Sequence, residues 1–437
     1  MRLAVPMTLA QLINVLYNII DRIYIGRMEQ GNALALTGVG VCLPVITMVI
    51  AFANLIGMGG APLFSIERGK GDETEAEFIL GNSFVLLIFF GIGLTGIGLL
   101  LKRPVLYLLG ASDVTYPYAN EYLTIYLLGT IFVLLSLGLN NFISGQGFGK
   151  MGMATVVIGA GLNILLDPVF IFVLNLGVKG AAVATVLSQA VAAAWTLRFL
   201  VSRKAVVRLR RCRLKPDGKR VLRIMGLGVS GFTMSVTNSL VQMVCNATLQ
   251  NYGGDLYVGV MTIINSVREV VSMPVSGIGA GTQPVMGYNY GAGREDRVRQ
   301  SISFMAVTLI VYTTLAWLLV FLFPRFFLGV FSTDSHVISE GVSCLHLYFF
   351  GFFMMALQFT GQTTFTGLGF SIRAVFFSIF RKVIIVVPLT LLLPKIPSLG
   401  VMGVFLAEPI SNFVGGGACF LTMYFTVYRC LKKKKIE

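Results

Sequence analysis

The sequence has little charge and few of the residues that metal sites and ATP sites use. Only 12% of its 437 residues are charged, whereas a soluble domain carries roughly twice that share. It has two histidines, and none of its six cysteines forms a CxxC pair, so neither a disulfide framework nor a zinc site is indicated. A GxxxxGK[ST] loop is also missing, which argues against ATP as the energy source.

Long apolar runs take the place of the missing charge. Apolar residues make up 56% of the chain, and the mean hydropathy is +0.82. The runs reach about 20 residues or more, the length that a bilayer requires, whereas a membrane β-barrel shows short alternating segments. We therefore predict an all-α membrane protein with twelve transmembrane helices. The predicted spans are 3–26, 36–65, 78–101, 119–143, 153–174, 181–201, 224–250, 257–287, 299–322, 338–364, 375–394 and 400–428.

The basic residues that give the chain its net charge of +15 are unevenly placed along the sequence. Lys and Arg collect at alternate helix ends, and the positive-inside rule then places both termini in the cytoplasm. This distribution predicts a plasma-membrane protein in contact with lipid and gives no reason to expect nucleic acid. The opposite side carries few basic residues: Arg27, Lys102, Arg103, Lys179, Arg325 and Lys395.

The densest basic segment, "SRKAVVRLRRCRLKPDGKR", predicts a cytoplasmic linker at 202–223. The positive-inside rule and anionic lipid head groups are sufficient to hold it, with a regulatory role as the alternative. The linker separates a six-helix bundle at 1–201 from a second one at 224–428, and a basic cytoplasmic tail follows at 429–437.

The two halves repeat one pattern. "GMGGAPLFSIERGKG" at 57–71 returns as "GAGTQPVMGYNYGAG" at 279–293, and "LGVKG" at 176–180 as "LGVMG" at 399–403. Each half has six spans, an even number, so the repeats are parallel. Two such halves with a cleft between them are a transporter architecture, in which rocking exposes the cleft to each side in turn. The pairs that are 222 residues apart are Gly57/Gly279, Gly59/Gly281, Pro62/Pro284, Gly69/Gly291, Gly71/Gly293, Tyr126/Tyr348, Gly129/Gly351, Gly145/Gly367 and Gly147/Gly369.

Polar residues within the spans of the first half point to a cation site. Asp21, Asp167 and Thr185 share a depth of about 6–10 Å below the outer boundary, at roughly 1.5 Å per residue. Asn163 lies one turn deeper on the face of Asp167. Oxygen ligands suit hard cations, and two carboxylates suit a monovalent cation or one or two protons. The alternative is structural, with the acid binding loose backbone donors and Asn163 linking two helices.

The second half has polar residues of its own. Arg268 and Glu408 enter from the same side at similar depth, so we predict a structural ion pair between them. Aromatic, methionine and polar side chains near the expected cleft suggest an adaptable substrate cavity, although ordinary packing explains them almost as well. The candidate cavity residues are Tyr17, Asn18, Gln242, Asn246, Met261, Glu269 and Gln283.

Motifs in both halves resemble one transporter family. "AVPMTLAQLINVLYNIIDRIYIG", "LNILLDPVFIF", "PVMGYNYGAG" and "AEPIS" are similar to MATE multidrug and toxin exporters of the MepA-like branch, and the resemblance covers essentially the whole chain. It implies export of bulky organic cations or other amphiphiles, driven by inward movement of Na⁺ or H⁺, with no other cofactor.

The resemblance also implies a ligand set for the coupling cation. The Asp of span one, the Asn and Asp of span five and the Thr of span six correspond to Asp21, Asn163, Asp167 and Thr185, with the Ala181 carbonyl as a fifth ligand. A second-half cation site is matched poorly, because span seven has no acid.

Two rival functions come from other classes. A flippase for lipid-linked saccharides shares the repeat architecture but lines its cleft with arginines, and Arg268 and Arg381 are expected at different depths. An intramembrane enzyme could pair Asp21 with Asp167, but no nucleophile motif or HExxH accompanies them. We therefore expect a monomeric cation-coupled exporter and no enzyme activity. The sequence leaves Na⁺ and H⁺ equally open.

Overall fold

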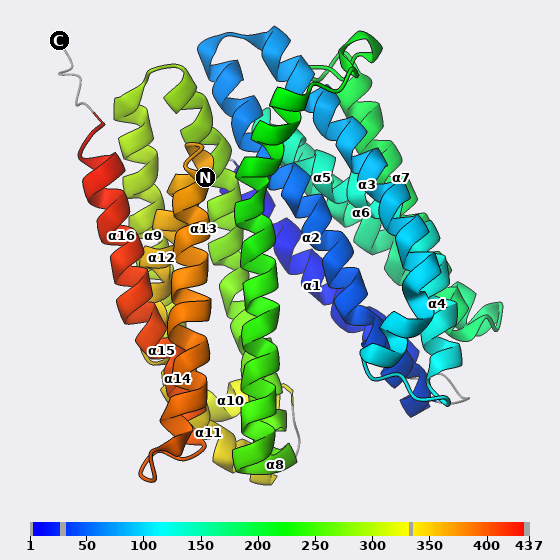
Figure 1. Cartoon of the computed structure of the whole chain (residues 1–437), viewed down its shortest axis with the longest axis vertical. Coiled ribbons are helices and arrows are strands. Elements are labelled where there is room, and N and C mark those ends of the chain that lie inside the picture. Colours follow the sequence, from blue (N-terminus) through cyan, green and yellow to red (C-terminus); the bar gives the residue numbers. More distant parts are fainter. Residues whose placement is uncertain (1–2, 27–31, 332–334, 432–437) are drawn as a thin grey trace. The chain divides into compact units, whose positions relative to one another are not determined.

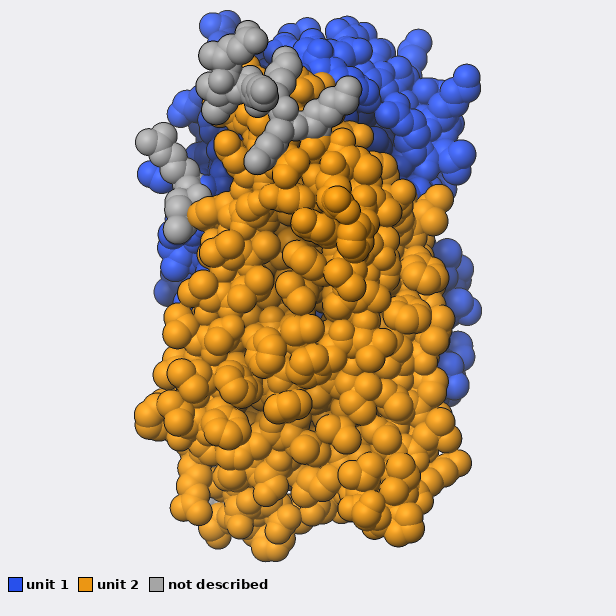
Figure 2. All heavy atoms as spheres, turned by 90° about the vertical axis from the view of Figure 1, so that its left-hand side faces the viewer, with its two compact units in different colours: residues 1–228 blue, residues 229–437 orange. Residues whose placement is uncertain are grey.

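The computed structural model describes residues 3–26, 32–331 and 335–431; the side chains of residues 15, 18–23, 25–26, 32–37 and 255 are outside this description. Helices make up nearly all of the described backbone, and no strand occurs in it (Figure 1), as the all-α prediction requires. The chain divides into unit 1, Met1–Gly228, and unit 2, Val229–Glu437, which are coloured separately in Figure 2. This boundary lies a few residues beyond the predicted start of the second bundle at 224.

Unit 1 contains seven long helices and two short segments among its described residues, and the first part of α8 belongs to it as well. They are α1 (Ala4–Gly26), α2 (Asn32–Lys70), α3 (Glu73–Leu108), α4 (Tyr116–Leu128), α5 (Thr130–Gly145), α6 (Gly149–Pro168), the π-helix η1 (Val169–Val173), α7 (Gly177–Val201) and the 3-10 turn η2 (Arg211–Arg213).

Unit 2 contains more, shorter elements, because π-helical turns interrupt its last two spans. They are α8 (Gly218–Gly291, broken at Gly254), α9 (Glu295–Leu322), α10 (Pro324–Gly329), α11 (Ser335–Phe349), η3 (Phe352–Met354), α12 (Met355–Gly367), α13 (Ser371–Ile379), η4 (Phe380–Val386), α14 (Val387–Leu392), η5 (Leu393–Lys395), α15 (Met402–Ser411), η6 (Asn412–Gly416), α16 (Gly417–Met423) and η7 (Tyr424–Tyr428).

These elements account for the predicted spans. Ten helices of the described residues are long and apolar enough to cross a membrane, and the bent pair α4 and α5 makes up to eleven. The 23-residue helix α1 occupies the place of the first predicted span. The bend of 55° between α4 and α5 was not predicted, because hydropathy reports the length of an apolar run and not its direction.

The predicted repeat is visible in the backbone. Gly71 and Gly293 both have positive φ, 85° and 65°, and so do Gly147 and Gly369, at 91° and 87°. After each of these glycines, the next N–H donates to the carbonyl five residues earlier, at 2.7–3.2 Å. This is a helix-ending motif that favours glycine, because a Cβ is strained at positive φ. The recurring glycines therefore end the same helices at the same places in both units.

Small residues bring the helices of unit 1 close together. α2 packs against α3 and α5, and α7 packs against α5 and α6. A Cβ added to Gly138 on α5 would lie 2.7 Å from the side chain of Leu87 on α3, too close for any real contact. Buried Phe64 meets Phe142 edge to face, with ring centroids 5.4 Å apart. Close packing of this kind replaces the hydrophobic effect as the force between helices in lipid.

The basic linker is held by unit 1 itself. Arg213 and Arg210 pair with Glu77 of α3 at 3.3 and 3.0 Å. The buried side chain of Gln146 donates to the Val207 carbonyl and accepts from its N–H, both at 3.1 Å. These contacts add protein partners to the lipid head groups that the sequence predicts.

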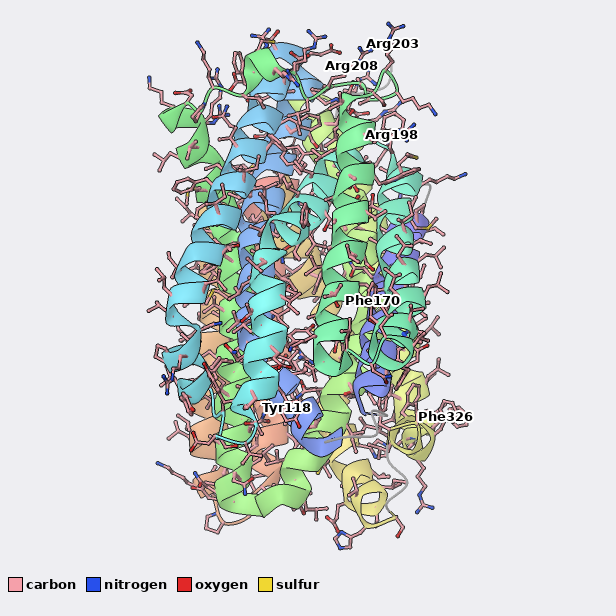
Figure 3. All side chains as sticks on the ribbon, turned by 90° about the vertical axis from the view of Figure 1, so that its right-hand side faces the viewer. Tyr118, Phe170, Arg198, Arg203, Arg208 and Phe326 are labelled. Atoms are coloured by element: carbon pink, nitrogen blue, oxygen red, sulfur yellow. The ribbon has the colours of Figure 1, made fainter. Side chains whose placement is uncertain are left out.

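The linker of unit 1 and the end of α7 place basic residues at one end of this unit. Arg203 and Arg208 of the linker, and Arg198 of α7, lie toward the same end in Figure 3, and Tyr118 of α4 lies toward the opposite end. Such segregation agrees with loops that alternate between basic and non-basic along the chain.

Candidate functional site

The predicted cation ligands of the first half come together where α6 meets α7. Asn163 and Asp167 are four residues apart on α6, so they share one face of the helix. The Asn163 Nδ2 donates to Asp167 Oδ1 at 3.2 Å and lies 3.4 Å from Thr185 Oγ1 on α7. The Thr185 hydroxyl donates to the Ala181 carbonyl at 3.0 Å. Four of the five predicted ligands are thus linked by consecutive hydrogen bonds.

All four residues are removed from solvent. Asp167 and Ala181 are 0% exposed, Asn163 is 2% exposed and Thr185 is 7% exposed. The Oδ1 of Asn163 accepts no hydrogen bond from any described residue. A buried acceptor without a donor is unfavourable, and so is a carboxylate in this surrounding. A cation held by these oxygens would relieve both.

The backbone next to Asp167 is irregular. Pro168 has no N–H, so the carbonyl of Ile164 loses its usual helical donor. The chain then widens into the π-helix η1, which Leu174 closes with an N–H bond to the Val169 carbonyl at 2.9 Å. Wider turns of this kind are found at functional sites more often than elsewhere in helices. The sequence signal is the Asp-Pro pair inside an apolar span.

Helix α1 packs mainly against α6 and supplies the remaining first-half residues. The side chains of Asp21 and Asn18 lie outside the described residues, so their predicted roles stay predictions. Tyr17 is half-buried on α1 and interacts with the buried Tyr126 of α4.

The candidate cavity residues of the second half are only partly brought together. Gln242 and Met261 line one pocket within unit 2. Asn246 and Glu269 do not belong to its lining, and Glu269 is exposed. Gln283 lies instead against Gly367 of α12, where an added Cβ would be 3.2 Å from its side chain.

The predicted ion pair between Arg268 and Glu408 is wrong. Glu408 on α15 accepts hydrogen bonds from Arg381 and from Lys382, whose Nζ lies 3.0 and 3.3 Å from the two carboxylate oxygens. Equal depth does not fix which way a side chain points, and the π-helix η4 presents two successive basic residues to one carboxylate. The sequence analysis missed Lys382, although two adjacent cations inside an apolar span could have signalled it.

Comparison with known proteins settles the family. The MatE family model matches residues 6–169 and 216–392, more than half of the chain. The chain belongs to the MatE family. The prediction of a MATE transporter is therefore confirmed, and with it the choice of a transporter class over an enzyme class.

Other MatE proteins resemble the chain over nearly its full length. "Multidrug export protein MepA" of Staphylococcus haemolyticus (strain JCSC1435) is 25% identical over 439 residues, covering 100% of this chain and 94% of that protein. The protein of the same name from Staphylococcus aureus (strain MSSA476) is 26% identical over 375 residues, covering 84% and 81%.

Solved MATE structures share the fold. One, described as the outward-facing conformation of a multidrug resistance MATE family transporter of the MOP superfamily, superposes with a TM-score of 0.92 at 24% identity. It covers 99% of this chain and 96% of that one. At this identity the likeness concerns the fold alone, so the roles of individual residues rest on their own geometry.

Proposed function

We propose that this MatE transporter exports bulky organic cations and other amphiphilic compounds in exchange for Na⁺ or H⁺. One observation carries the coupling: a fully buried Asp167 lies within hydrogen-bond reach of Asn163, which in turn reaches Thr185. The relatives named multidrug export proteins support the substrate class.

The geometry around Asn163 suggests how the cation enters. Its amide nitrogen lies between Asp167 Oδ1 and Thr185 Oγ1. Turning the amide by 180° exchanges Nδ2 for Oδ1, so that three oxygens face one another. A monovalent cation then replaces the two N–H donors, and the Ala181 carbonyl and Asp21 complete an oxygen shell of the kind that hard cations prefer. A proton needs only the carboxylate.

Coupling requires the cation to bind one conformation better than the other. A ligand with equal affinity for both states shifts no population, however tightly it binds. Cation binding would change the conformation of the irregular backbone at Pro168 and η1, because this segment has carbonyls without helical donors and a π-helical turn. Substrate would enter from the cytoplasm or the inner leaflet and leave on the other side.

The setting of the protein belongs to the same proposal. The chain is a multi-pass membrane protein, and we place it in the plasma membrane with both termini in the cytoplasm, because the basic loops lie on that side. It acts as a monomer and uses no cofactor apart from the coupling ion.

Ethidium transport into proteoliposomes tests the proposal. Na⁺ and pH gradients are imposed separately, with the membrane potential clamped, on wild type, Asp167→Asn and the control Asp113→Asn at an exposed loop position. A tenfold gradient supplies about 1.4 kcal/mol per ion, so one-for-one exchange accumulates ethidium about tenfold. We expect accumulation with one gradient in wild type and in the control, and none in Asp167→Asn. Equal accumulation in Asp167→Asn and wild type would show that the acid is structural.

Thr185 separates Na⁺ from H⁺ in the same assay. Thr185→Val removes one oxygen ligand and Thr185→Ser keeps it. If Na⁺ is the coupling ion, the valine variant needs a several-fold higher Na⁺ concentration for half-maximal transport and the serine variant does not. If H⁺ is the coupling ion, both variants keep the wild-type pH dependence.

A flippase for lipid-linked saccharides is the second candidate. The observation that favours it is the gathering of Arg268, Arg381 and Lys382 around one carboxylate of unit 2, because lipid phosphates seek such cations. Movement of a fluorescent lipid-linked saccharide in the same vesicles, independent of Asp167 and without any ethidium transport, would place this function first.

A further inference from the structure

Unit 2 contains a buried cluster with an excess of positive charge. Arg381 and Lys382 of η4 and Glu408 of α15 are each less than 9% exposed. Arg268 of α8 acts on the same carboxylate without an ion pair to it. Glu269, next to Arg268 in sequence, is exposed and also acts on that guanidinium. Three cations and two acids leave one positive charge in excess within a membrane-spanning unit. Such an excess is costly in a medium of low dielectric constant unless an anion balances it.

Arg268 is the member of the cluster without a partner of its own. Its Nε is buried and donates to no described residue, and no hydrogen bond or ion pair of its guanidinium occurs in the described structure. Its ionisable neighbours include Tyr348, Glu408 and Glu269, and Glu408 is already held by Arg381 and Lys382. A guanidinium carries five donors in a fixed fork that matches the two oxygens of a carboxylate or phosphate.

Arg268 is among the residues that line a pocket of unit 2. Lys382 and Tyr348 line it together with the carboxylate of Glu408, which Lys382 holds at 3.0 Å. The side-chain amides in the lining, Asn238, Gln242 and Asn265, add donors. The remaining wall is largely apolar, formed by Val241, Met261, Val386 and Val404 among others. The pocket thus combines two cations, of which only Lys382 is paired with Glu408, with an apolar surround, and this suits a negative head group carried on an apolar body.

We propose that this pocket of unit 2 binds an oxyanion, a carboxylate or a phosphate carried by an amphiphile, with Arg268 as its principal ligand and Lys382 as a supporting cation. The charge excess of the cluster matches the single charge of a carboxylate or of a singly ionised phosphate. This site is separate from the acidic cluster of Asn163 and Asp167 and has the opposite polarity. It does not depend on the proposed export of organic cations.

Equilibrium dialysis with three ligands on the same ring tests the site. Benzoate, phenyl phosphate and neutral benzamide are dialysed against the purified full chain in phosphatidylcholine nanodiscs. We expect saturable binding of at least one anion and none of benzamide. Arg268→Gln should weaken that binding at least about tenfold, as expected for the loss of a charge-assisted bidentate contact. Arg297→Gln, at an exposed position of the same unit, should bind as wild type does.

The remaining variants keep the result interpretable. Arg268→Lys retains the charge without the fork and should recover part of the affinity, and Lys382→Gln should weaken binding by a smaller factor. Benzoate binding alone identifies a carboxylate site, and phenyl phosphate binding alone identifies a phosphate site; either supports the proposal. It is overturned if neither anion binds better than benzamide, or if Arg268→Gln binds as tightly as Arg297→Gln. Because the readout is binding, a failure of ethidium transport leaves this result unaffected.

Discussion

Replacing Glu408 with Gln should strongly destabilise unit 2. The carboxylate is 7% exposed and accepts charge-assisted hydrogen bonds from Arg381 and Lys382. Removing it leaves Arg381 and Lys382 buried without an ion-pair partner among the described residues. Breaking a buried ion pair from one side costs about 3–5 kcal/mol. For a unit of this size, each kcal/mol lowers the melting temperature by roughly 2–4 °C, so we expect a fall of about 6–20 °C.

The assay is thermal loss of monodisperse protein in detergent at a fixed heating time. Glu340→Gln serves as the control, because Glu340 accepts the Tyr257 hydroxyl at 3.0 Å and no other donor among the described residues, and a Gln oxygen can accept it equally well. Its melting temperature should fall by no more than about 3 °C. Lys382→Met, added to Glu408→Gln, removes one of the stranded cations and should recover a substantial part of the loss.

The double-mutant cycle between Glu408 and Lys382 gives the decisive number. A buried, hydrogen-bonded pair should show a coupling energy above about 1 kcal/mol. The reasoning is refuted if Glu408→Gln melts as the Glu340→Gln control does. It is also refuted if Lys382→Met fails to recover any stability in the Glu408→Gln background, because another group would then be neutralising the positive charge of the buried cations.

Three further predictions concern the linker and the repeat. Arg220, at the start of α8, pairs with Glu75 of α3 and with Asp217 of the linker. Arg220→Gln removes both ion pairs and should speed tryptic cleavage of the linker up to about fivefold, an effect that 0.5 M NaCl reproduces in wild type; unchanged cleavage would contradict it. Gln146→Ala strands the buried N–H and carbonyl of the linker and should cost about 2 kcal/mol in the thermal assay. Gly147→Ala and Gly369→Ala should each cost about 1–2 kcal/mol because both glycines have positive φ, whereas Gly96→Ala, exposed within a helix, should cost nothing.

Much of the fold could be predicted because its determinants are local. The length of an apolar run decides whether a segment crosses the bilayer, since every backbone polar group in lipid has to be satisfied within a helix. Glycine at a helix end is equally local, because its positive φ depends on a few neighbouring bonds. The matched pair Gly147 and Gly369 therefore reports a structural repeat without knowledge of any long-range contact. The bend between α4 and α5 was not predicted, because an apolar run does not specify the direction of the helix axis.

One part of the candidate cation site could be predicted because it lies within a single helix. Asn163 and Asp167 are four residues apart, and helix geometry alone places them on one face. Their approach to Thr185 also requires α6 and α7 to pack side by side with these faces turned toward each other. A similar depth in the membrane makes such an approach possible. The rotation of each helix about its axis decides whether the side chains meet.

The cluster around Glu408 shows what the sequence by itself did not determine. Composition and span boundaries placed Arg268 and Glu408 at one depth in the membrane. A shared depth did not suffice to predict which residue pairs with Glu408. The choice of Arg381 and Lys382 depends on how α15 and the π-helix η4 are rotated and packed within unit 2. The sequence alone determined which segments cross the membrane and where they end, because backbone hydrogen bonding in lipid is a local requirement. Only the tertiary structure decided which buried charges meet, because that depends on the rotation of neighbouring helices about their axes.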